Sequence, residues 1–398
     1  MLNLNCQGPV SADLKGEFKM AKLRYGMVGG GPGSFIGAAH RRAINIDGQA
    51  ELVAGVFSRN REKALVTANE LGIDESRCYE NYEEMAKAEA AREDGIDFVV
   101  IVTPNVTHYP AAKAFLEAGI NVSCDKPLCI TTEQADELVA LAEQKGLLFL
   151  VTYTYTGYVT VKSIRDYIRE GKIGKIRSVM AEYPQGWLAK EGDFGGKQGE
   201  WRSDPKQSGG VNCLGDLGTH VENLAATMTG LKIKRVLAKL DIVVPGRVLD
   251  DNDMVMVEYD NGATGMYWTS QIAIGYDNSL RIRIYGENGT IEWFQEENEK
   301  FTYIHDDGTI EEIHRGYGSI SSDAAAYGRL PAGHPEGWLE SMGNLYLSFI
   351  KCINAKKDGS FTEDMIDFPT VKSGAEGIHF IEACLESTNN GNVWVDMK

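Results

Sequence analysis

Asp216 and His220 form the residue pair in this chain that is best suited to acid–base chemistry. They lie four residues apart in a stretch where apolar residues recur at helical spacing up to Gly230, a typical helix stop. On a helix both side chains would emerge on one side, one turn apart. A carboxylate beside an imidazole can orient the ring and favour its protonated form. The pair is therefore a candidate for general acid–base catalysis, and the alternative is a solvated pair on a surface helix.

A glycine-rich stretch near the start of the chain is a candidate phosphate-binding turn. It follows an apolar strand expected at 23–28, and it leads into a helix. Such a turn lets the backbone approach a pyrophosphate, whose charge the helix N-terminus favours. The spacing G-x-G-x-x-G is only partly met, because Ser34 takes the third place and Gly37 could replace it; the alternative is a flexible loop. The residues expected to touch a dinucleotide here are Gly29, Gly31, Gly33, Ser34, Phe35 and Ile36.

Strands and helices alternate through the first 150 residues. Strands are expected at 51–57, 97–102, 121–124 and 147–151, and helices at 61–71, 108–118 and 132–145. This alternation predicts βαβ units and a doubly wound parallel sheet of the Rossmann type. At the end of the second strand Ser58 and Arg59 stand where NAD-binding sheets usually have an acidic residue. The pair could hold a 2′-phosphate, which favours NADP slightly over NAD.

The second half of the chain has the pattern of an antiparallel sheet. Asn261-Gly262, Asn288-Gly289 and Asp307-Gly308 each separate two alternating strands, which predicts three hairpins. The fold class is therefore α/β, with a Rossmann domain followed by an α+β domain built on a large, mostly antiparallel open sheet. The predicted parts are an extension at 1–22, a dinucleotide-binding domain at 23–151, and a substrate-binding and oligomerisation domain at 152–398.

Composition excludes several classes of protein. The formal charge is −17, and no basic run is long enough to follow a nucleic acid backbone. No apolar run approaches the roughly 18 residues of a membrane span, and the first 20 residues lack the apolar core of a signal peptide. The seven cysteines are scattered without metal-ligand spacing, so neither a metal site nor a disulfide framework is expected. A reducing, cytoplasmic location fits this cysteine usage best.

Four motifs follow one another in a fixed order: Thr103-Pro104-Asn105-x-x-His108, Asp125-Lys126-Pro127, Trp201-Arg202 and Asp216-Leu217-Gly218-x-His220. This series resembles the Gfo/Idh/MocA oxidoreductase family over the chain from about residue 23. The resemblance implies that Lys126 binds the reacting hydroxyl beside a nicotinamide, Asp216 orients the substrate and His220 removes the hydroxyl proton. The first two motifs would also contact the cofactor, and the family's Glu-Lys-Pro is Asp-Lys-Pro here.

Four further residues are candidates for substrate contact: Tyr155, after the last parallel strand, Trp201, Arg202 and the loop residue His334. Packing at the domain boundary is the alternative for Tyr155, and a structural ion pair is the alternative for Arg202. The resemblance implies an NAD(P)-dependent dehydrogenase or ketoreductase acting on a ring secondary hydroxyl of a sugar, glycoside or cyclitol. One face of the second sheet could be apolar enough to pair with another subunit, which predicts a homodimer or homotetramer. The alternatives are a redox-neutral, NAD-dependent glycoside-cleaving enzyme and a non-catalytic sugar or dinucleotide sensor.

Overall fold

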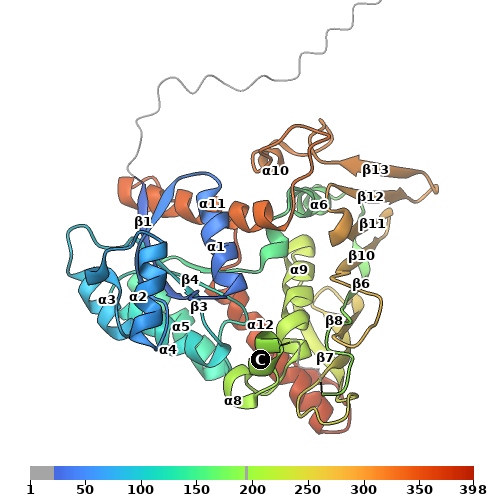
Figure 1. Cartoon of the computed structure of the whole chain (residues 1–398). Helices are drawn as coiled ribbons and strands as arrows, with labels where there is room; N and C mark the ends of the chain where they lie inside the picture. Colours follow the sequence, from blue (N-terminus) through green and yellow to red (C-terminus); the bar gives the residue numbers. More distant parts are fainter. Residues whose placement is uncertain (1–21, 193–195) are drawn as a thin grey trace, which may run out of the picture.

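The computed structural model describes residues 22–192 and 196–398. The predicted N-terminal extension lies outside the described residues, apart from its last position. Figure 1 shows two sheets with helices between them, one in the blue N-terminal part and one at the opposite edge of the molecule.

The first sheet has five strands, all parallel, in the order β2-β1-β3-β4-β5. All five residues of β3 are buried, as expected for a strand covered on both faces. The predicted Rossmann sheet is thereby confirmed. Its strands are β1 (Leu23–Gly29), β2 (Ala50–Val56), β3 (Phe98–Val102), β4 (Asn121–Cys124) and β5 (Phe149–Val151). The helices that connect them are α1 (Phe35–Asn45), α2 (Arg61–Glu70), α3 (Tyr82–Ala90), α4 (His108–Glu117) and α5 (Thr132–Lys145).

The second sheet has nine strands in the order β13-β12-β11-β10-β6-β9-β8-β7-β14. Only β6 and β9 pair in parallel, and the other neighbours are antiparallel, which confirms the predicted mostly antiparallel sheet. The three Asn-Gly and Asp-Gly turns connect β8 to β9, β10 to β11 and β12 to β13, as predicted. The strands are β6 (Ile176–Pro184), β7 (Ile233–Asp241), β8 (Asn252–Tyr259), β9 (Thr264–Ser270), β10 (Arg281–Gly286), β11 (Gly289–Phe294), β12 (Lys300–His305), β13 (Ile310–His314) and β14 (Val395–Asp396).

Helices of the second half gather on one side of this sheet (Figure 1). The buried side chains of α6 and α9 share a core with alternate residues of the sheet strands. These helices are α6 (Val159–Arg169), α7 (Gly196–Arg202), α8 (Pro205–Ser208), α9 (Thr219–Thr229), α10 (Ser322–Ala325), α11 (Trp338–Asp358) and α12 (Val371–Asn389). No helix in the described part of the chain is long and apolar enough to cross a membrane.

The C-terminal helices return to the first sheet. Met342, Tyr346 and Phe349 of α11 pack in one core with β1 and β3, and Val371 and Ile378 of α12 pack in the other core of that sheet. The last parallel strand is also tied to the segment before α12, because the Val151 amide donates to the Pro369 carbonyl. The two halves of the chain therefore share a core, and this fixes the elements that meet between the sheets.

Candidate active site

A cavity of about 770 Å³ lies between the two sheets. One side is formed by the loops that follow β1, β3 and β4, the edge of a doubly wound sheet where ligands bind. The other side is formed by the second half of the chain. The predicted residues that line the cavity are Gly33, Ser34, Phe35, Ile36, Thr103, Pro104, Asn105, Asp125, Lys126, Pro127, Tyr155, Trp201, Arg202, Asp216 and His220.

The glycine-rich turn presents the start of α1 to this cavity. Ser34 caps the helix, since its Oγ accepts from the Gly37 amide at 3.2 Å. Gly37 packs on the turn itself, where an added Cβ would lie 2.4 Å from the Gly30 Cα. The first amides of α1 have no acceptor within the helix, so the turn has the local structure that binds an anion.

Two predicted glycines shape the turn without lining the cavity. Gly29 has φ +91°, and a Cβ there would lie 2.6 Å from the Val102 carbonyl oxygen. A Cβ on Gly31 would lie 2.2 Å from the Phe57 carbonyl oxygen. Both glycines therefore allow the turn to lie close to the ends of β3 and β2.

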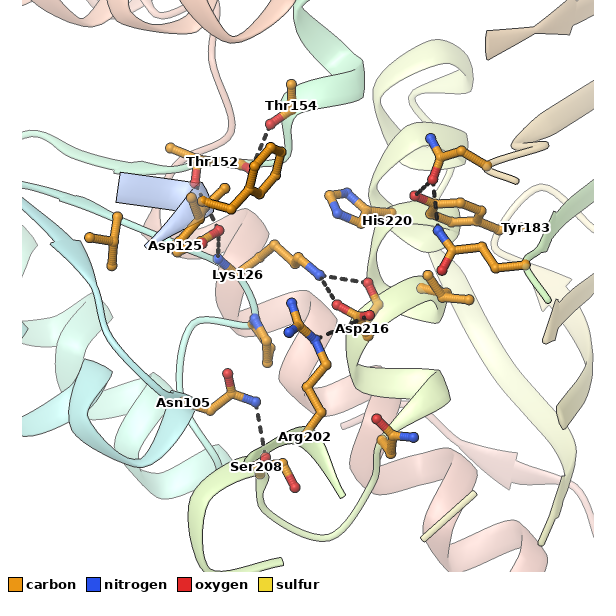
Figure 2. A pocket seen from close by; sticks show the side chains of 18 of the residues that line it. Asn105, Asp125, Lys126, Thr152, Thr154, Tyr183, Arg202, Ser208, Asp216 and His220 are labelled. Atoms are coloured by element: carbon orange, nitrogen blue, oxygen red, sulfur yellow. Dashed lines mark hydrogen bonds and ion pairs between the residues drawn. The ribbon is translucent and has the colours of Figure 1, made fainter. Parts of the chain in front are cut away.

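The loops after β3 and β4 are held together below the cavity by His108. Its two ring nitrogens lie 2.8 Å from the Thr103 and Pro127 carbonyl oxygens, and the ring is buried. His108 thus positions the two predicted motifs and does not line the cavity. Asn105 connects this side to the second half, because its Nδ2 donates to the Ser208 carbonyl at 3.0 Å (Figure 2).

Lys126 and Asp216 form an ion pair across the cavity. The Lys126 Nζ lies 2.7 Å from both the Asp216 Oδ1 and the Asp216 carbonyl oxygen. The other carboxylate oxygen lies 3.3 Å from the Arg202 Nε and accepts from the Gln271 Nε2 at 3.2 Å. Figure 2 shows Lys126 and Arg202 approaching the same carboxylate from opposite domains. Burial alone would raise the pKa of Asp216, but Arg202 and Lys126 lower it well below its ordinary value.

Asp216 and His220 interact only through their charges, and no hydrogen bond joins the two side chains. Asp216 lies in a π-helical turn, η4 (Leu214–Gly218), and His220 lies in the following helix α9. The carboxylate turns to Lys126 and Arg202, because charge-assisted bonds to cations are stronger than a bond to a neutral ring. Burial and Lys126 lower the pKa of His220 well below its ordinary value, although Asp216 raises it. The imidazole is therefore neutral rather than protonated at pH 7.

Three tyrosine rings hold His220 in place. The ring centroids of Tyr153, Tyr155 and Tyr183 lie 5.7, 4.7 and 6.1 Å from the imidazole, all edge to face. The His220 Nδ1 is buried and has no hydrogen-bond partner among the described residues. Nε2 is therefore the nitrogen that can meet a ligand in the cavity.

Three predicted residues lie away from this centre. Ser58 accepts from the Asn60 amide, Arg59 is exposed after β2, and neither lines the cavity. His334 is exposed, and its carbonyl accepts from Arg315 at 2.8 Å. Four residues later Trp338 does line the cavity, where its ring stacks with Phe35 at 6.1 Å.

The sequence analysis missed the polar wall of the cavity on the side of the second sheet. Its members lie on β6, on the loop before β10 and after β11, so no local spacing connects them. A hydrophilic residue at the end of an otherwise alternating strand, such as Gln185 after β6, is the signal that was available. The missed residues are Tyr183, Gln185, Trp187, Asn278, Gln295 and Glu296, with Thr152 and Thr154 on the opposite side.

A buried group of possible ligand atoms lies behind η4. Cys213, Asp250 and Asp253 bring these atoms within 4.8 Å of one another. Both Asp250 oxygens already accept backbone amides, from Asn212 at 2.7 Å and Leu214 at 2.6 Å. Burial and the charge of Asp250 raise the pKa of Asp253 well above its ordinary value.

Two observations indicate that the loops after β1 and β3 could hold a dinucleotide. The turn after β1 is closed by glycines that no larger residue could replace, and α1 begins at the cavity. The Thr103 Oγ1 and the Asn105 Oδ1, both on loops that line the cavity, are buried without a hydrogen-bond partner among the described residues. A bound ligand could satisfy both oxygens.

Comparisons with known proteins agree with this arrangement. A family described as an oxidoreductase family with an NAD-binding Rossmann fold matches residues 23–153. A family described as the GFO/IDH/MocA C-terminal domain matches residues 161–292. An uncharacterized oxidoreductase of Bacillus subtilis is 40% identical over 97% of this chain and 100% of its own length. The levoglucosan dehydrogenase of Pseudarthrobacter phenanthrenivorans is 29% identical over 68% of this chain and 73% of its own length.

Solved structures extend the likeness to nearly the whole chain. An inositol dehydrogenase homologue from Azotobacter vinelandii, solved in complex with NAD+, has a TM-score of 0.91 at 34% identity. The alignment covers 95% of this chain and 98% of that one. A structure of such a homologue from the same organism, with NADH and myo-inositol, has a TM-score of 0.89 at 34% identity, with the same coverage of both chains.

Proposed function

The chain belongs to the Gfo/Idh/MocA oxidoreductase family, and on that premise we propose that it oxidises a ring secondary hydroxyl of a sugar, glycoside or cyclitol, or reduces the corresponding ketone. The observation that carries this proposal is the position of Lys126, Asp216 and His220 in one cavity with the start of α1. The relatives whose names include inositol dehydrogenase and levoglucosan dehydrogenase support the substrate class.

Each residue of the set has a defined part in this reaction. Bound NAD or NADP would supply the carbon that accepts the hydride. Lys126 would donate a hydrogen bond to the reacting oxygen and stabilise the negative charge that develops there. His220, neutral because its pKa is low, would accept the hydroxyl proton at Nε2. Asp216 remains an anion and holds the Lys126 ammonium in the cavity.

A direct test measures reduced nicotinamide formed from a panel of inositols, pyranosides and levoglucosan. We expect turnover with at least one of them, and a loss of roughly 10²–10⁴-fold in kcat for His220→Ala with cofactor binding retained. Release of an aglycone without net reduced cofactor would support redox-neutral cleavage instead. Cofactor and sugar binding without any reaction would support a sensor.

The choice of cofactor is the second part of the proposal. Ser58 and Arg59 favour NADP, because no acidic side chain follows β2 and the guanidinium could pair with a 2′-phosphate. The solved relatives hold NAD+ or NADH, which favours NAD. If Arg59 reads a 2′-phosphate, Arg59→Ala will lower kcat/KM for NADP at least tenfold and leave that for NAD unchanged.

We further propose that two copies pair through the face of the nine-stranded sheet that no described helix covers. Met254, Met256 and Met266 on this face are 52, 50 and 44% exposed. Across the sheet Leu237, Met256, Met266 and Met180 lie side by side in register. A continuous apolar patch of this kind is typical of a subunit interface.

A further inference from the structure

Asn278 is the centre of the polar wall that faces the catalytic residues. Its Oδ1 accepts from the Tyr183 hydroxyl at 2.6 Å and from the Gln185 Nε2 at 2.7 Å. Its Nδ2 lies 3.0 Å from the Tyr155 hydroxyl oxygen and 3.0 Å from the Gln295 Oε1. All five residues line the cavity. The amide of Asn278 therefore uses all four of its hydrogen-bonding positions on other residues of the wall.

The direction of each hydrogen bond in this wall follows from Trp187. An indole N–H can only donate, so the Gln185 atom that faces it at 2.8 Å must be the oxygen. The Gln185 nitrogen then faces Asn278, which places the Asn278 oxygen towards Gln185 and Tyr183. The Asn278 nitrogen consequently faces Tyr155. The orientations of both amides, which are otherwise ambiguous, are thus fixed by one donor.

The two phenols complete a closed ring of hydrogen bonds with Asn278. Tyr183 must donate its proton to the Asn278 oxygen, and Tyr155 must accept from the Asn278 nitrogen. The hydroxyl oxygens of Tyr155 and Tyr183 lie 2.5 Å apart, and since the Tyr183 proton is already used, Tyr155 donates to Tyr183. Both phenol protons are therefore used inside the ring, so neither hydroxyl can donate to a ligand. The Tyr155 oxygen also accepts from the Trp338 side chain, so the lone pair offered to the cavity is that of Tyr183.

A carboxylate adds to the acceptors of this wall. Glu296 also lines the cavity, and its Oε1 accepts from the Asn278 amide at 3.2 Å. Burial raises the pKa of Tyr155 and raises that of Tyr183 well above its ordinary value, so both phenols keep their protons. The side of the cavity opposite the Lys126 loop is consequently rich in hydrogen-bond acceptors.

We propose that the Tyr155–Tyr183–Asn278 ring is a specificity element that selects neutral polyols whose hydroxyls, on the side away from the reacting carbon, donate to the wall. The inference rests on the proposed function and narrows its substrate class. A carboxylate, a phosphate or an ether oxygen on that side of the ligand has no proton to donate. Its lone pairs would face the acceptor oxygens of the wall without a hydrogen bond between them. Sugar acids, sugar phosphates and O-methylated rings are thereby disfavoured, because an unpaired buried acceptor is costly.

The test compares probes that differ in one group. The probes are myo-inositol, its monodeoxy and mono-O-methyl derivatives at each ring position, and D-glucose against D-glucuronate. With wild-type enzyme we expect one or two positions where removal of the hydroxyl lowers kcat/KM roughly tenfold and methylation lowers it further. We expect the glucuronate kcat/KM to be at least 100-fold below that for glucose.

Variants then assign the selectivity to the ring. In Tyr183→Phe the Tyr155 proton is released and can be donated to the substrate, so the penalties for the methyl ether and the carboxylate should each shrink at least tenfold. The matched control is Tyr267→Phe, which removes a hydroxyl from the buried Tyr259–Tyr267 pair, 2.6 Å apart and not lining the cavity. The ratios of kcat/KM between probes in Tyr267→Phe should equal those of the wild-type enzyme.

Two outcomes would overturn the inference. One is an equal kcat/KM for the hydroxyl and the methyl ether at every ring position, and the other is the same set of kcat/KM ratios in Tyr183→Phe and Tyr267→Phe. Calorimetric binding of the same probes to NAD-saturated protein supplies a second measurement that needs no turnover. If no probe is oxidised, the proposed function fails. The binding ratios of wild type and Tyr183→Phe then still decide for or against the acceptor wall.

Discussion

The charge of Lys126 contributes to keeping His220 neutral. Burial lowers the pKa of His220, Lys126 lowers it further, and Asp216 opposes both. In wild type the acid limb of the kcat/KM profile for oxidation should therefore lie well below pH 6.5. Lys126→Met should lower kcat by roughly 10²–10⁴-fold and move the acid limb of the residual activity to higher pH, because the imidazole then gains its proton more easily. The pH profile of both proteins measures this shift.

A surface lysine provides the control for that experiment. Lys113 pairs with Glu137 on the outside of the first sheet. Lys113→Met should leave both kcat and the acid limb unchanged. An acid limb at the same pH in wild type and in Lys126→Met would contradict the electrostatic role of Lys126.

Glu222, two residues after His220, should make the fold less stable in alkaline solution. It is buried, its Oε2 has no hydrogen-bond partner among the described residues, and burial and Glu376 raise its pKa to about 8. An unfolded glutamate releases its proton near pH 4.5, so the unfolded state binds fewer protons between these two values. The free energy of unfolding should therefore fall as the pH rises through this window.

Glu222→Gln removes this pH dependence. We expect Tm to rise by about 3 °C or more at pH 8 and to change little at pH 4.5, as measured by calorimetry at both pH values. Glu376→Gln, which removes only the neighbouring charge, should give a smaller change in the same direction. A uniform loss of stability in Glu222→Gln at every pH would show that the carboxyl has a partner essential to the fold.

At the scale of the elements, the turn before η4 is held by a single carboxylate. Asp250 accepts from the Asn212 and Leu214 amides, and the Asn212 Nδ2 donates to the Gln271 Oε1 at 2.7 Å. Gln271 in turn donates to Asp216. Asp250→Asn leaves one of these backbone amides without an acceptor. It should cost about 1–3 kcal/mol of stability and lower kcat at least tenfold, with cofactor binding retained.

The adjacent residue is a closely matched control for this variant. Asp251 is buried and accepts two consecutive amides, those of Val243 and Val244, each at 2.9 Å. Asp251→Asn should therefore lower Tm by a similar amount while kcat stays near the wild-type value. Equal losses of kcat in both variants would show that the effect of Asp250 is general destabilisation. Thermal unfolding and steady-state kinetics of the pair distinguish the two cases.

Most helices and strands could be predicted from the sequence, because the residues that determine each of them lie within a few positions of one another. The buried run Phe98–Val102 and the turn Asn261-Gly262 each determine their structure from nearby residues alone. The partners of Asp216 could not be predicted this way. Lys126 lies 90 residues away and Gln271 lies 55 residues away, and their approach depends on the packing of the two halves. The strand β7 was missed because polar and apolar residues do not alternate along Ile233–Asp241, where Val236, Leu237 and Ala238 follow one another.

The whole molecule places its proposed catalytic residues between two sheets that share helices. The helices α11 and α12 pack on the first sheet, and α12 also packs along β7 of the second. Figure 1 shows α12 between the two halves and the second sheet at the edge of the molecule. The helices cover the face of that sheet which is turned towards the cavity, and no described helix covers its methionine-rich face.

A second copy of the chain is the occupant we expect on this methionine-rich face. Purified protein should elute with a mass of two or four times 43.7 kDa in size-exclusion chromatography with light scattering. Met256→Lys should shift the mass towards 43.7 kDa, because an unpaired ammonium would be buried in the middle of the patch. Val66→Lys is the control, since Val66 on α2 is equally exposed at 50% and lies on the first domain. A wild-type mass of 43.7 kDa at 10 µM, or an unchanged oligomer in Met256→Lys, would exclude this interface.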